Sequence, residues 1–464
     1  MTPARNIIVQ MRQVIAFAFT GWTLVVGLLW PQAASVYLQI ITVKTPESLD
    51  QALAQLQSGQ DFADLARKHS THSTAGDGGV WGPVRLNDLP EAVSARIEKA
   101  AEGELIHFFE PTLGHTILKK ISPGAARKIN FQLAFDRGAA HLQRGEKEPA
   151  LKEMKRAVAL DPQSAAAHQL LGQAYLSQGS YEMLSEARAE LVQAIALDPN
   201  LVWARFYLAR IYLDLNQPRK AKEQLEAALT IRPNVPHLLS LLGEAHRQLG
   251  APDLAIDQNR KALAADPSFF IAHYYLGRAY LDLKNDDEAI RELEESAKPG
   301  YPAAEIYLTL GKVYFQKNQV ERAVELFQKA VSAAPTQPEG HLRLAQAYRV
   351  KGQSEMALKE LSLAAPEGQR LLSNAYYQQL QVEVFFERGL IHQEKRAFPQ
   401  AVEAYTSALE LNPNHGPAHR QVAEVFLRLG QYERASEHAA KAEELKSPVD
   451  SSLLEKIKAK QRPD

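Results

Sequence analysis

A pattern that repeats along most of the chain constrains its fold more than any other feature. Each copy has a Gly or Ala, then an aromatic residue or His three positions later, and in most copies an Ala twelve positions after the first residue. Successive copies are spaced by 34, 37, 34, 34, 34, 34, 44 and 34 residues. A period this regular predicts a stack of similar units, each too small to bury its apolar face alone. The small residues that start the pattern are Gly138, Gly172, Ala209, Gly243, Gly277, Gly311, Ala345, Gly389 and Ala423.

The residues of each unit indicate two packed helices. A small residue lets two helices approach closely, the aromatic side chain fills the space beside it, and the later Ala receives the neighbouring helix. Many units end in a proline, which cannot continue a helix; these are Pro162, Pro199, Pro233, Pro267, Pro335 and Pro413. These residues resemble tetratricopeptide repeats, and the resemblance implies an all-α solenoid of about nine repeats over residues 123–447.

The resemblance also implies a concave groove lined by the first helix of each repeat. Positions three before and one after the small residue would face this groove, and within repeats three to six the third, fifth and sixth repeats combine an apolar or aromatic residue with a cation there. Such a surface suits an extended peptide with apolar and acidic side chains. Alternatively, the aromatic residues only pack between helices. The candidate groove residues are Phe206, Arg210, Tyr274, Arg278, Leu308 and Lys312.

Two irregular stretches interrupt and close the array. The 44-residue spacing places ten extra residues around residues 366–379, which we expect to extend a helix or form a loop. The polar tail, residues 448–464, contains the lysine-rich segment SSLLEKIKAK. This segment predicts a short helix that caps the last repeat.

Residues 36–122 lack the repeat pattern and instead alternate strand-like, helical and Gly-rich segments, which predicts a compact α+β domain before the array. The β-branched run VYLQIITV precedes a helical stretch to KHS, the Gly-rich turn AGDGGVWG, a helix near PEAVSARIEKA and closing strands. The combination of GQDFADLARKHS, GGVWG and GELIHFFEPTLGHTILKKI resembles the parvulin family of peptidyl-prolyl isomerases. The resemblance implies catalysis of prolyl bond rotation, whose uncatalysed barrier is about 20 kcal/mol.

The parvulin resemblance assigns two groups of candidate site residues. It implies apolar contacts to the proline ring at Trp81, Leu89 and Val93. It implies a polar centre with two strand histidines and a loop Cys or Asp, and those positions here hold Gln39, Thr116 and His72.

Both expected strand histidines are therefore replaced. His115 is one residue from the expected place and would face the other side of its strand, unless the alignment shifts by one residue. Isomerisation forms no covalent bond, and Gln, Thr and His can all make hydrogen bonds to a twisted amide. The replacements put turnover in question more than peptide binding.

An apolar run near the N-terminus indicates export. Residues 14–30 carry no charge, Arg5 and Arg12 precede them, and the first acid is Glu47. Residues 1–35 therefore predict a signal peptide cleaved after Ser35 or a signal anchor, starting at Met1 or Met11. The rest of the chain would then be extracytoplasmic, in the periplasm or cell envelope, with the membrane contacted only through this segment. A cytoplasmic array behind a reverse anchor conflicts with the upstream arginines.

Composition excludes several classes of function. The chain has no cysteine, which rules out disulfides, thiolate nucleophiles and iron–sulfur clusters. Its formal net charge of −1 and lack of a long basic run argue against nucleic acid as a partner. His69 and His72 have no matching third ligand, so we expect no metal and no cofactor.

Two hypotheses follow from the sequence. The first is an exported parvulin-like isomerase or folding factor that binds proline-containing segments of client proteins, with the repeats for protein–protein interaction. The second is a non-enzymatic scaffold of an envelope assembly, in which the parvulin-like domain only binds peptide.

Overall fold

The computed structural model describes residues 35–111, 114–179, 183–298, 304–365 and 375–461. The apolar run at 14–30 and the predicted signal segment up to residue 34 lie outside the described residues. Within the described ranges, no helix is both long and apolar enough to cross a membrane. The chain divides into two compact units, residues 1–211 and 212–464.

The first unit starts with a four-stranded antiparallel sheet, in the order β2-β1-β4-β3. Its strands are β1 (Ser35–Val43), β2 (Val80–Arg85), β3 (Leu105–Glu110) and β4 (Gly114–Ile121). The helices between the strands are α2 (Pro46–Gln57), α3 (Phe62–His69) and α4 (Glu91–Lys99), with the short 3-10 turns η1 (Ala75–Asp77) and η2 (Leu86–Asp88). The predicted α+β domain is present, but the VWG segment expected in a turn forms the edge strand β2.

Strand alternation divides the small domain into two apolar cores. On one face of the sheet, Leu38, Ile40 and Leu118 pack with residues of α4. On the other face, Ile41 and Ile117 pack with residues of α2 and α3. Because successive strand residues point to opposite faces, the register of β1 and β4 decides which side chains can share a site.

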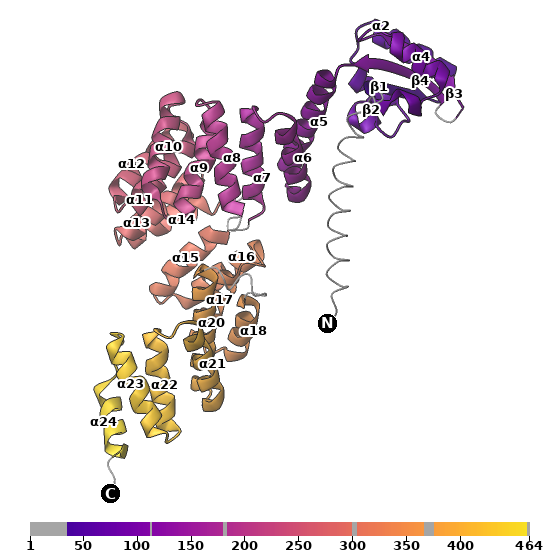
Figure 1. The fold of residues 1–464 in the computed structure, drawn as a ribbon. Coiled ribbons are helices and arrows are strands. Elements are labelled where there is room, and N and C mark those ends of the chain that lie inside the picture. The colour runs from indigo at the N-terminus through magenta and orange to yellow at the C-terminus, as the bar shows by residue number, and fades with distance from the viewer. Residues whose placement is uncertain (1–34, 112–113, 180–182, 299–303, 366–374, 462–464) are drawn as a thin grey trace, which may run out of the picture. The chain divides into compact units, whose positions relative to one another are not determined.

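Helix pairs fill the rest of the described chain (Figure 1). In the first unit these are α5 (Pro123–Gln143) with α6 (Lys147–Leu160), and α7 (Ala165–Ser177) with α8 (Met183–Leu197); α9 (Val202–Asp214) contains the boundary between the units. The second unit contains α10 (Pro218–Ile231), α11 (Pro236–Gln248), α12 (Pro252–Ala265), α13 (Ile271–Asp282), α14 (Asp286–Ser296), α15 (Ala304–Gln316), α16 (Val320–Ala333), α17 (Pro338–Val350), α18 (Ser354–Ala364), α20 (Ala375–Glu394), α21 (Phe398–Leu411), α22 (Gly416–Arg428), α23 (Tyr432–Glu444) and α24 (Ser451–Gln461).

Close approach explains the small residue at the start of each repeat pattern. A Cβ placed at Gly277 would lie 2.6 Å from Leu293 Cγ, inside van der Waals contact. At Gly389 the same atom would lie 2.3 Å from the ring of Tyr405. The alanine twelve residues after Gly277, Ala289, is fully buried. The two helices of a repeat therefore pack as the sequence pattern predicts.

A residue in the left-handed conformation ends the first helix of every repeat. It follows the small residue by seven positions, and its positive φ turns the chain into the second helix. Most repeats use Gly or Asn here, as expected from sterics. The nine residues are Gly145, Gly179, Asn216, Gly250, Lys284, Asn318, Gly352, Arg396 and Gly430.

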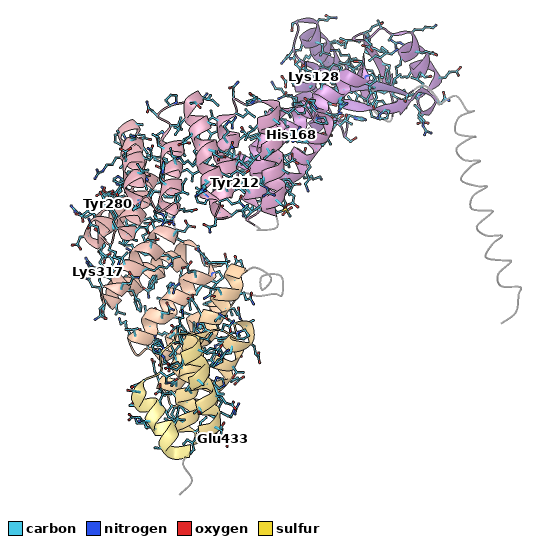
Figure 2. The ribbon with its side chains drawn as sticks, turned by 60° about the vertical axis from the view of Figure 1, so that its left-hand side comes forward. Lys128, His168, Tyr212, Tyr280, Lys317 and Glu433 are labelled. Atoms are coloured by element: carbon cyan, nitrogen blue, oxygen red, sulfur yellow. The ribbon has the colours of Figure 1, made fainter. Side chains whose placement is uncertain are left out.

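A histidine four residues before the small residue pairs with the second helix of its repeat in four places. His168, labelled in Figure 2, lies 2.5 Å from Glu190, His273 lies 2.6 Å from Glu292 and His341 lies 2.7 Å from Glu360. In the last repeat the acid is replaced, and His419 Nδ1 lies 2.8 Å from His438 Nδ1.

The irregular stretches are partly described. Residues 366–374 lie outside the described part, whereas residues 375–379 extend α20, a helix of 20 residues. The predicted C-terminal helix is α24, and its buried Ile457 and its Leu454 join the apolar core of the last repeat.

Candidate functional site: a peptide site on the α+β domain

Two threonines lie side by side on the face of the sheet that packs against α4. Thr42 on β1 and Thr116 on β4 are direct cross-strand partners, and both are almost fully buried. Phe108 on β3 pairs with Thr116 from the other side. Thr116 Oγ1 donates to the carbonyl of Gly114 at 3.3 Å. The position that the parvulin resemblance assigns to the last-strand histidine, Thr116, therefore lies on this face and carries a hydroxyl group.

The loop after α3 adds two more hydroxyl groups. Thr71 Oγ1 lies 2.9 Å from Thr42 Oγ1, and the Thr71 amide donates to the Thr42 carbonyl at 2.8 Å. Ser70 Oγ accepts from the amides of Thr42 at 3.1 Å and His72 at 3.2 Å. Thr42, Ser70, Thr71 and Thr116 are called the hydroxyl cluster below.

His72 continues this cluster toward the apolar part of the site. Its Nδ1 accepts from the Thr74 amide at 3.2 Å and lies 2.9 Å from Thr74 Oγ1. An Nδ1 atom that accepts a backbone hydrogen bond leaves the proton of the neutral ring on Nε2. Burial lowers the pKa of His72 below its ordinary value, which favours this neutral form.

Trp81, one of the three predicted apolar contacts, lies next to His72. The rings of His72 and Trp81 are 5.6 Å apart between centroids and tilted by 58°. Trp81 and Leu89 are partly exposed and Val93 is buried, and all three pack against the core that includes Ile40. The structure therefore brings His72, Thr116 and the three apolar residues to one face of the domain.

Gln39 does not join this face. It alternates with Leu38 and Ile40 along β1 and points to the opposite side, where its Nε2 donates to the carbonyl of Gly78 at 3.3 Å. Ile40 occupies the corresponding place on the α4 side. His115 also faces away from Thr116, pairs with Val43 and contacts the ring of Phe109. The observed register thus leaves neither histidine nor glutamine at the strand positions of the site.

Sequence reasoning missed three members of the hydroxyl cluster: Thr42, Ser70 and Thr71. The available signal was the run of hydroxyl residues in STHST at residues 70–74, directly after a helix that ends beside β1. Thr42 could have been found from strand alternation, because it shares the face of Leu38 and Ile40. In the described residues, no three His, Asp or Glu side chains are grouped so that they could hold a metal ion.

The candidate groove residues of the second unit are already engaged within the array. The Arg278 guanidinium lies 5.5 Å from the centre of the Tyr274 ring and 3.3 Å from Glu244, a buried acid that Arg247 also binds. Leu308 is only 4% exposed and belongs to the core. Tyr274 is partly buried against the same core.

Lys312 is paired in the same way. It binds Glu339, which also accepts from the hydroxyl of Tyr376 at 3.1 Å. Burial alone would raise the pKa of Glu339, but the hydrogen bond and charge of Lys312 hold it below its ordinary value. Both predicted groove cations of the second unit are thus paired with acids of the array, Arg278 with Glu244 and Lys312 with Glu339.

The remaining two groove candidates belong to the first unit, on α9. The ring of Phe206 contacts Trp203 at 5.5 Å and Tyr207 at 5.3 Å between centroids. Phe206 is half-buried and Arg210 is exposed. These contacts are those of an aromatic group packed along its own helix.

Comparison with known proteins assigns both parts of the chain. Residues 42–122 match the PPIC-type PPIASE domain. Tetratricopeptide repeat models match residues 138–179, 206–268, 260–305, 303–352 and 386–448. The chain is therefore a PPIC-type PPIase domain followed by tetratricopeptide repeats, and the two resemblances inferred from the sequence are confirmed.

Individual proteins match only parts of this chain or match it distantly. Chaperone SurA from Photobacterium profundum is 32% identical over 76 residues, which are 16% of this chain and 18% of that protein. The chain thus spans less than a fifth of this curated relative. The structure of the APC/C hetero-tetramer Cut9–Hcn1 is 13% identical over 90% of each chain, with a TM-score of 0.49. That of PilF from Pseudomonas aeruginosa is 23% identical over 51% of this chain and 99% of that chain, with a TM-score of 0.40.

Proposed function

We propose that this chain is an exported folding factor whose PPIC-type domain binds proline-containing segments of other proteins and speeds their cis–trans isomerisation. One observation carries the proposal: the Trp81 ring, which packs in the same apolar cluster as Leu89 and Val93, lies 5.6 Å from the ring of His72. A proline ring needs an apolar contact, and the amide beside it needs hydrogen-bond donors and acceptors.

The chemistry requires only that the site favour the twisted amide over the planar one. Rotation breaks the resonance of the amide, so no covalent intermediate or proton transfer is needed. The apolar face excludes water around the proline ring. The Nε2–H of neutral His72 donates to the peptide as its resonance is lost, in a setting where a fixed donor is worth more than water.

A specific observation favours a second candidate function, peptide binding without catalysis. Thr116 stands where the parvulin resemblance implies one strand histidine, and Gln39, where it implies the other, points away from the site's face. A site that has lost those side chains can still hold an extended proline-containing segment. In this reading the domain is an adaptor, and the repeats assemble a protein complex.

The location and partners are part of the proposal. The arginines before the apolar run of residues 14–30 support export to the periplasm or envelope, as an anchored or secreted protein. Tetratricopeptide repeats support a protein partner. The pairing of Arg278 and Lys312 favours apolar and polar client segments over acidic ones.

A protease-coupled isomerisation assay on the full chain tests the proposal. The substrates are proline peptides that vary the residue before proline. Trp81→Ala should abolish the acceleration and weaken peptide binding by about tenfold, because it removes the aromatic contact. Trp203→Ala, which removes the same residue type from α9, serves as the matched control.

The outcomes separate the candidates. Acceleration that Trp81→Ala removes and Trp203→Ala leaves intact supports an isomerase. Peptide binding without acceleration supports the adaptor. A folded chain that neither binds nor accelerates any peptide contradicts both.

A further inference from the structure

The first helix of the array is built directly onto the PPIC-type domain. β4 ends at Ile121 and α5 begins at Pro123, with Ser122 between them as the helix cap. Ala126 of α5 shares an apolar cluster with Ile121 and with Val80 of β2. Ala125 and Ile129 of α5 and Tyr37 of β1 complete this cluster. The helix thus packs on two strands without an intervening linker (Figure 1).

Arg137, about four turns along α5, reaches the loop that carries His72. Its Nη1 lies 2.7 Å from Asp77 Oδ1, and its Nη2 donates to the carbonyl of Gly76. Both acceptors belong to the 3-10 turn η1. One guanidinium therefore fixes a side chain and a backbone group of the same turn.

This turn is hydrogen-bonded directly to His72. The amide of Ala75, the first residue of η1, donates to the His72 carbonyl at 2.9 Å. The two ends of the loop are tied to β1, through Thr71 to Thr42 and through Gly79 to Ile40, each at 2.8 Å. Arg137 holds the middle of the loop from a helix outside the sheet.

We propose that Arg137 is a positioning residue for His72, and that α5 completes the peptide site while also serving as the first helix of the array. The inference rests on the proposed function only for the site's role in peptide binding. Arg137 and Asp77 are each more than a third exposed, so their pair contributes little to folding. Its consequence is geometric, because the planar guanidinium holds two acceptors in a fixed relation that a lysine cannot reproduce.

Substitutions in the full chain separate positioning from stability. Arg137→Ala and Arg137→Lys are compared with Arg127→Ala as the matched control. Arg127 lies on the same helix and also donates to a backbone carbonyl, that of Leu160 on α6. The His72 ring is titrated by NMR, with its signals assigned from His72→Gln, and binding of a proline peptide is measured in parallel.

We expect both Arg137 variants to raise the pKa of His72 toward its ordinary value, because a loosened loop admits water around the ring. Peptide affinity should fall about fivefold, since the site loses preorganisation. Arg127→Ala should change neither quantity. An unchanged His72 titration in Arg137→Ala overturns the inference, as does an equal change in Arg127→Ala. If the wild-type chain binds no proline peptide but Arg137→Ala still shifts His72, the proposed function fails and the positioning role stands.

Discussion

At the scale of single residues, the four histidine pairs of the array differ in the group that faces the histidine. In three of them this group is a carboxylate, that of Glu190, Glu292 or Glu360. In the last repeat His419 faces His438, and two protonated rings would repel each other. Burial, the charge of His419 and the charge of Arg434 lower the pKa of His438 to about 4.

The His438 pair therefore predicts acid sensitivity of the last repeat. An unfolded His438 takes up its proton near the ordinary value of 6.5, so between pH 6.5 and 4 the unfolded state binds more protons. Stability is present above the unfolded value and is lost as the pH falls. His438→Glu should recover about 1–2 kcal/mol at a pH near 5, discounted for partial exposure, relative to neutral pH. Urea unfolding at both pH values measures the difference.

An exposed histidine provides the control for this prediction. His107→Glu makes the same substitution on an exposed strand position. It should leave the pH dependence of the wild-type chain unchanged. Equal pH dependence in the wild type and His438→Glu would show that the histidine pair is not the sensitive group.

At the scale of helices and strands, two repeats end their first helix with a residue type that is sterically unfavourable in the left-handed conformation. These residues are Lys284 and Arg396. Lys284 has a φ of 57° at a position where most repeats carry Gly or Asn. A residue with a Cβ pays a steric cost in this region.

Lys284→Gly should therefore stabilise the second unit by about 0.5 kcal/mol, after the greater flexibility of glycine in the unfolded chain is subtracted. Thermal or urea unfolding of the variant checks the expectation. Lys261→Gly, within helix α12, should instead destabilise by about 1 kcal/mol. Destabilisation by Lys284→Gly would mean that steric cost at this φ is not the controlling factor.

Periodicity made the elements of the array predictable, whereas the site depended on register. Spacing alone located the small residues and the helix pairs, because each repeat forms the same local contacts. The placement of Gln39 could not be decided this way, since a shift of one residue moves a strand side chain to the opposite face. The ion-pair partners of Arg278 and Lys312 could not be predicted from the sequence either, because Glu244 and Glu339 belong to other repeats.

At the scale of the whole molecule, internal pairing of charges bears on how a client is held. The chain has 53 basic and 54 acidic residues, and the described cations at the predicted groove positions of the second unit bind acids of the array. We therefore expect the chain to exert little long-range electrostatic attraction on a charged client.

We accordingly expect binding of a proline-containing client to change by less than about twofold between low and physiological salt. Calorimetric titration at the two salt concentrations measures this. Arg210→Ala, which removes an exposed cation of α9, is the companion variant and should leave the salt response unchanged. A steep loss of affinity with salt would identify an electrostatic client surface instead.

The shared helix α5 has a consequence for modularity. A PPIC-type domain cut at residue 122 would lose Ala126 and Ile129 from its own apolar cluster, and an array begun there would carry those side chains uncovered. We therefore expect that neither part can be fused to another protein at this boundary unless the apolar side chains exposed by the cut are covered or replaced.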